Sequence, residues 1–116
     1  MARSFESQTR HDAEVSKLYR SFTSNTDWSQ VRADLAGQAK PDLVDGHVPD
    51  VAGVFKSRPW YVEVETDDTY ASGHSLSQYR AFLRAGGLVI SVPAKVESEL
   101  KSFIATNGVT ATVFTY

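Results

Sequence analysis

The chain of 116 residues contains no cysteine. Disulfide bonds and thiolate metal sites are therefore excluded together. The absence fits a reducing cytosol, so we expect a cytoplasmic protein. No apolar run approaches the ~20 residues that a transmembrane helix needs, and residues 1–6 lack the apolar core of a secretory signal. We therefore expect neither a membrane span nor a signal peptide.

The chain also has little net charge. Its 12 basic and 14 acidic residues give a formal charge of −2, so any contact with nucleic acid must come from a local basic patch. Charged residues make up 22% and hydrophobic residues 41%, which is typical of a folded soluble protein and excludes a disordered chain. The length suffices for one domain with a sheet and a few helices.

Hydrophobic spacing predicts a first helix over residues 4–22, where apolar side chains recur every three or four positions. Residues 28–35 fit two interpretations, a helical turn capped by Asp27 or a first strand. In a regular strand one face would carry Trp28, Gln30 and Arg32, and the other face would carry Val31 and Ala33. The segment 37–49 holds two glycines and two prolines and is expected to be a loop with a short extended piece.

The rest of the chain is expected to alternate strands and helices. The helix after Ser75 is closed by Gly86 and Gly87, and the nearly continuous apolar run that follows is typical of a central strand buried on both faces. The expected elements are a hairpin at 51–56 and 59–66, the helix after Ser75, a strand at 88–92, a helix at 95–106 and a strand at 109–116.

This order, α-β-β-β-α-β-α-β, indicates an α/β fold with a mixed sheet of four to five strands flanked by helices. Strand–helix–strand units in the second half imply parallel neighbours joined by right-handed crossovers.

Three acidic residues are predicted to meet on one face of the hairpin. With the turn centred on Ser57 and Arg58, Asp50 falls opposite Glu65, and Glu63 shares the face of Glu65 because side chains alternate with period two. A divalent metal ion could occupy the point on which the carboxylates converge. The alternative is a solvated face, which is the usual meaning of Glu-x-Glu on a strand.

The sequence Pro49-Asp50, followed after about a dozen residues by Glu63-Val64-Glu65, resembles the PD-(D/E)xK nuclease superfamily. The resemblance covers roughly residues 4–93, since a helix and a hydrophobic strand follow the acidic strand there as well. It implies a restriction endonuclease-like fold, one nuclease-like domain over residues 1–116, and metal-dependent hydrolysis of DNA. A homodimer is also expected from the resemblance, because such compact domains often need a partner subunit to cut both strands.

The resemblance also assigns roles to residues. Asp50 and Glu63 would be the main ligands of Mg²⁺ or Mn²⁺, with Glu65 as a further ligand and Glu14 as a candidate from the first helix. From its place on the helix after Ser75, Gln78 could face the site and hydrogen-bond a phosphate or a water; the alternative is a solvent-facing helix residue. At such a site Mg²⁺ lowers the pKa of a water and clamps a phosphate oxygen, and one Asp with one or two Glu suffices to hold it.

The chain departs from the superfamily at the third motif position, where Glu65 replaces the usual Lys. Some active restriction enzymes of the superfamily also carry Glu there, as a general base or a ligand of a second metal. The departure leaves the identity of any cationic helper open. Lys56 lies at the hairpin turn, which is expected to be too far along the strand for this role.

Four basic residues are candidates for holding a DNA backbone, namely Lys56, Arg58, Arg80 and Arg84. A solvated basic face is the alternative. Two other functions are considered for the whole chain: a catalytically inactive member of the fold that binds nucleic acid or a protein partner, and a small structural dimer with surface acids.

Overall fold

A five-stranded mixed sheet forms the centre of the computed structural model, which describes residues 3–116. The strands lie in the sheet in chain order; the first three are antiparallel neighbours, and the third, fourth and fifth are parallel. The strands are β1 (Trp28–Ala33), β2 (Val51–Phe55), β3 (Arg58–Val64), β4 (Gly87–Val92) and β5 (Thr112–Thr115). The predicted α/β class and the predicted order of elements are confirmed.

The three helices begin and end close to the expected residues. They are α1 (Phe5–Thr23), α2 (Gly73–Ala85) and α3 (Glu97–Thr106), and α3 follows a short 3₁₀ turn, η1 (Ala94–Val96). Helix α1 is capped by Ser4, whose hydroxyl accepts a hydrogen bond from the Ser7 N–H. None of the helices between residues 3 and 116 combines the length and the apolar character that crossing a bilayer requires.

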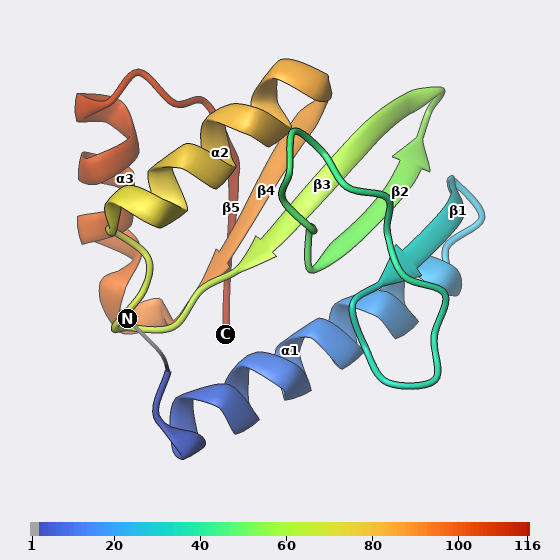
Figure 1. Ribbon diagram of the computed structural model, residues 1–116, viewed down its shortest axis with the longest axis horizontal. Helices are drawn as coiled ribbons and strands as arrows, with labels where there is room; N and C mark the ends of the chain where they lie inside the picture. The colour runs from blue at the N-terminus through green and yellow to red at the C-terminus, as the bar shows by residue number, and fades with distance from the viewer. Residues whose placement is uncertain (1–2) are drawn as a thin grey trace.

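Helix α1 covers one face of the sheet, and α2 and α3 cover the other (Figure 1). Both parallel connections place their helix on the same face, as right-handed crossovers require. The fold therefore has two apolar layers, one on each side of the sheet, and every residue of β4 is buried between them. This confirms the central strand predicted from the apolar run.

The segment 28–35, for which a helical turn and a strand were both considered, contains strand β1. Its pairing with β2 is interrupted by a bulge between Ser29 and Arg32, and Gln30 has a φ of 53°. The extra residue breaks the strict alternation, so Trp28, Val31 and Ala33 all pack toward α1. The expected grouping of Trp28 with Gln30 and Arg32 on one face is therefore wrong, because it assumed a regular strand.

The β2–β3 hairpin turns one residue earlier than expected. Lys56 and Ser57 have φ values of 51° and 66°, and Phe55 pairs with Arg58. Positive φ at both central residues is the requirement of a two-residue hairpin turn whose twist matches that of the strands. The predicted centre at Ser57 and Arg58 is therefore wrong.

This turn moves every cross-strand pair by two residues. Val51 pairs with Val62, so Asp50 lies beside Glu63, not opposite Glu65 as expected. A shift of two residues leaves each side chain on its predicted face, whereas a shift of one would have exchanged the faces.

The cap of α2 is also corrected. Ser72 is the N-cap, and its hydroxyl accepts a hydrogen bond from the N–H of Ser75 at 3.0 Å. Ser75, the expected cap, lies in the first turn of the helix and is buried. The final strand is shorter than expected because pairing with β4 begins only at Thr112.

Gly87 allows β4 to lie close to Trp60, its partner in β3. A Cβ at Gly87 would overlap the indole ring. We expect Gly87→Ala to lower the free energy of unfolding by about 1–3 kcal/mol, the usual cost of overpacking, measured by urea denaturation. Gly73→Ala is the matched control, since nothing lies within 4 Å of its added methyl group, and it should leave stability unchanged or slightly raised. Equal effects of the two substitutions would contradict this packing.

Candidate functional site

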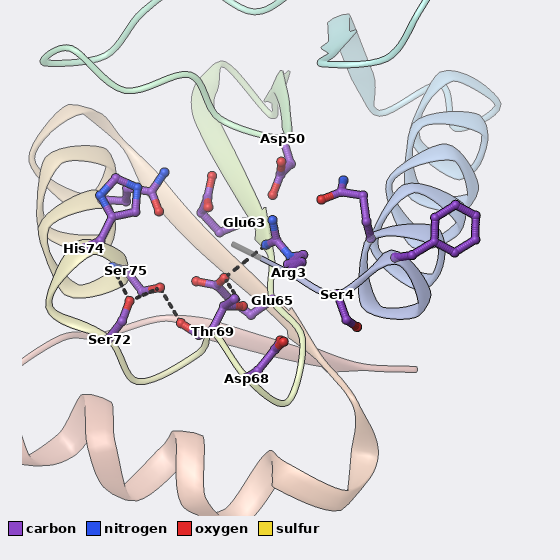
Figure 2. A pocket seen from close by; sticks show the side chains of 13 residues that line it. Arg3, Ser4, Asp50, Glu63, Glu65, Asp68, Thr69, Ser72, His74 and Ser75 are labelled. Atoms are coloured by element: carbon purple, nitrogen blue, oxygen red, sulfur yellow. Dashed lines mark hydrogen bonds and ion pairs between the residues drawn. The ribbon is translucent and has the colours of Figure 1, made fainter. Parts of the chain in front are cut away.

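A cavity of about 600 Å³ lies where β3 leaves the sheet, between the start of α1 and the start of α2. Figure 2 shows Asp50, Glu63, Glu65 and Arg3 pointing toward one another in this space. Gln78 of α2 also lines the cavity. The structure thus brings together the four residues that were predicted as catalytic, and it adds an arginine from the segment before α1.

Asp50 is held at the site by the main chain of β3. Its Oδ2 accepts a hydrogen bond from the Val64 N–H at 2.8 Å, which continues the β2–β3 pairing with a side chain. Its Oδ1 lies 3.2 Å from Nε2 of His11, on α1. These two contacts fix the orientation of the carboxylate.

His11 links Asp50 to a second carboxylate, since its Nδ1 lies 2.9 Å from Asp12 Oδ1. Burial lowers the pKa of His11, but the nearby carboxylate of Asp50 and the hydrogen bond with Asp12 raise it, and the net pKa lies above its usual value. A protonated His11 offsets part of the negative charge of the site.

Glu63 is the least compensated group of the site. Its side chain is only 4% exposed, and its Oε1 has no hydrogen-bond partner among the described residues. Burial, followed by repulsion from Asp50 and Glu65, raises the pKa of Glu63 well above its usual value. A buried acid without a partner costs free energy, and a bound cation would remove that cost.

Glu65 is buried as well, but both of its oxygens have partners. Thr69 donates to Oε1 at 2.9 Å and the Tyr79 hydroxyl donates to Oε2 at 2.7 Å. A guanidinium nitrogen of Arg3 lies 3.5 Å from Oε1. Burial raises the pKa of Glu65, and the hydrogen bonds from Tyr79 and Thr69 oppose that rise.

The residues at the cavity suit a small hard cation. Between residues 3 and 116 no three His, Asp or Glu side chains lie close enough together to hold one ion. Mg²⁺, however, keeps several waters and is commonly bound through one or two carboxylates together with substrate phosphates. Asp50 and Glu63 are two such carboxylates, and the partnerless Oε1 of Glu63 is an oxygen that such an ion would satisfy.

Glu14 is placed elsewhere. It is buried on the α1 side of the sheet, where its Oε2 accepts from the Ser91 hydroxyl at 2.8 Å and its Oε1 lies 3.1 Å from Lys17 Nζ. It does not line the cavity that contains the other acids.

The four basic residues proposed for DNA binding are not among the described residues that line the cavity, and they have contacts of their own. Glu63 lies five residues beyond Arg58, a path of about 17 Å along a strand. Lys56 lies over the ring of Phe55 and Arg58 over that of Trp60. On α2, Arg80 donates to the Asn107 carbonyl and Arg84 pairs with Asp45 at 2.6 Å. Their role in DNA binding stays a prediction.

Several residues of the site were not predicted from the sequence. His11 was detectable, because it lies on the buried stripe of α1, three residues before Glu14, where an ionisable side chain is unusual. Tyr79 was not among the predicted site residues. Arg3 and Thr69 gave no signal, since the Arg3 contact joins residues 61 positions apart.

Comparison of this chain with protein-family models, with curated proteins and with solved structures finds no match.

The raised pKa of Glu63 predicts that Glu63→Gln stabilises the metal-free protein. Above the unfolded pKa, about 4.3, the folded state holds this proton more tightly than the unfolded state does, so stability falls as the pH rises. Glutamine removes that cost. Tm in EDTA should therefore be higher for Glu63→Gln than for the wild type near neutral pH.

The gain from Glu63→Gln should vanish near about pH 4. Glu99→Gln, on the exposed side of α3, is the control and should change Tm little at either pH. A destabilised Glu63→Gln variant, or a gain that does not depend on pH, would contradict the account of Glu63.

Proposed function

We propose that the protein is a metal-dependent nuclease that hydrolyses phosphodiester bonds in DNA, with Mg²⁺ or Mn²⁺ as cofactor. The observation that carries the proposal is the partnerless buried carboxylate of Glu63 beside Asp50. Groups with such perturbed pKa values in a cavity are candidates for functional sites. The resemblance of Pro49-Asp50 and Glu63-Val64-Glu65 to the PD-(D/E)xK superfamily supports the same reading, as does the helix–hairpin–helix–strand order.

The reaction is the attack of water on phosphorus. The water loses a proton, the bond from phosphorus to the leaving sugar oxygen breaks, and that oxygen takes up a proton. A divalent cation at such a site activates the water and offsets the charge on the phosphate. Asp50 and Glu63 would hold this cation, and Asp50 is kept in place by the Val64 N–H and by His11.

Gln78 has the position of a residue that orients the reactants. It lines the cavity from α2, opposite the start of α1. Its amide can donate to a phosphate oxygen and accept from a water. The homodimer and the cytoplasmic location expected from the sequence belong to the same proposal.

The proposal predicts cleavage of plasmid DNA in the presence of Mg²⁺ or Mn²⁺ and none in EDTA. Asp50→Asn and Glu63→Gln should each reduce the rate at least about 100-fold, because each removes one charged ligand. Glu99→Gln should cleave like the wild type. Equal rates for all four proteins would rule out the assignment of these acids.

Titration with Mn²⁺ tests the metal site without reference to activity. The wild type should bind Mn²⁺ with measurable heat, and Glu63→Gln should lose most of that affinity. A wild type that binds DNA but neither binds Mn²⁺ nor cleaves would exclude the nuclease and leave the catalytically inactive member of the fold.

A further inference from the structure

Arg3 reaches the end of β3 from the segment that precedes α1. Its Nη2 donates to the Val64 carbonyl at 3.1 Å and lies 3.5 Å from Glu65 Oε1. The side chain is only 20% exposed, and its Nε is buried without a hydrogen-bond partner among the described residues. The guanidinium is thus held against the motif strand, with donors left over.

The contacts of Glu65 suit it to hold the guanidinium of Arg3 in place. Glu65 receives hydrogen bonds from Thr69 and Tyr79 and the ion pair from Arg3. Both oxygens of Glu65 accept a hydrogen bond and one also lies near Arg3, whereas Oε1 of Glu63 has no hydrogen-bond partner among residues 3–116. The two glutamates of Glu63-Val64-Glu65 therefore have different tasks, and Glu63 is the better placed to hold a metal ion.

The cavity is lined mainly by acidic residues, so a phosphate can bind there only if a cation offsets their negative charge. Four carboxylates line it, those of Asp50, Glu63, Glu65 and Asp68. Within residues 3–116, Arg3 is the only Lys or Arg side chain that lines it. A DNA phosphate would be repelled by these acids unless positive charge offset them.

We propose that Arg3 is a catalytic residue that contacts the phosphate being cleaved, and that Glu65 is the positioning residue that holds it. This inference rests on the proposed nuclease function and deepens it. The guanidinium of Arg3, held by Glu65, then supplies positive charge at the place where the resemblance expects a lysine. A guanidinium suits the task because its planar fork has five donors, so it can bind Val64 and Glu65 and still donate to phosphate oxygens.

The test compares DNA cleavage and Mn²⁺ binding in the wild type, Arg3→Ala, Arg3→Lys and Arg10→Ala. Arg3→Ala should cleave about 100- to 1000-fold more slowly, as expected for loss of one group that stabilises the transition state. Its Mn²⁺ affinity should be unchanged or higher, because no ligand is lost and a nearby cation is removed. Arg3→Lys should recover part of the rate. Arg10 pairs with Asp67 outside the cavity, so Arg10→Ala should match the wild type.

Two further measurements separate charge delivery from a merely structural role. Added guanidinium at tens of millimolar should restore part of the activity of Arg3→Ala and none of that of Glu63→Gln. Glu65→Gln should slow cleavage in the wild type but add no further loss to Arg3→Ala, since the two residues act as one unit.

The proposal for Arg3 is overturned if Arg3→Ala cleaves within about threefold of the wild type, or if it loses Mn²⁺ binding together with activity. It is also overturned if the losses from Arg3→Ala and Glu65→Gln are additive. A wild type that neither cleaves nor binds Mn²⁺ would remove the proposed function itself, which is a different outcome from failure of Arg3 alone.

Discussion

The site depends on the hydrogen bond from the Val64 N–H to Asp50 Oδ2. This bond carries the β2–β3 pairing one step past the last backbone pair and fixes Asp50 beside Glu63. Two further hydrogen bonds fix the main chain at this end of β3. The Glu65 N–H donates to the Ser91 carbonyl at 2.8 Å, and the Tyr116 hydroxyl donates to the Glu65 carbonyl at 2.6 Å. The acids are therefore displayed by backbone that cannot shift without breaking the sheet.

A second feature is that two buried acids at the same end of β3, Glu63 and Glu65, differ in their hydrogen-bond partners. Glu65 is supplied with donors from the turn after β3, from α2 and from the segment before α1, so its burial is compensated. Glu63 lies two residues away, and no donor in the described part of the chain reaches its Oε1. A fold that can satisfy one acid and leaves its neighbour unsatisfied gives up stability at that point, as functional sites commonly do. This contrast is the basis for treating Glu63 as a ligand and Glu65 as a support.

The fold was predicted from the sequence where periodicity and turn chemistry were regular. The stripe of α1 and the apolar run of β4 give their elements directly, because each reflects burial of one face or of both. Errors arose at local backbone features that the pattern does not record. Positive φ at Lys56 and Ser57 set the turn, and the bulge near Gln30 set the faces of β1. Both depend on backbone geometry that non-glycine residues rarely adopt.

For the site, the sequence by itself determined that Asp50, Glu63 and Glu65 would share one end of one sheet face, since alternation along strands is a local property. Gln78 was a candidate because it lies on the helix that follows the acidic strand. Only the tertiary structure decided what surrounds them. Arg3, His11 and Tyr79 reach the acids from different helices and segments, and Glu14 is turned to the other side of the sheet. Such contacts join residues far apart in the chain, and they depend on how helices pack, which no local pattern specifies.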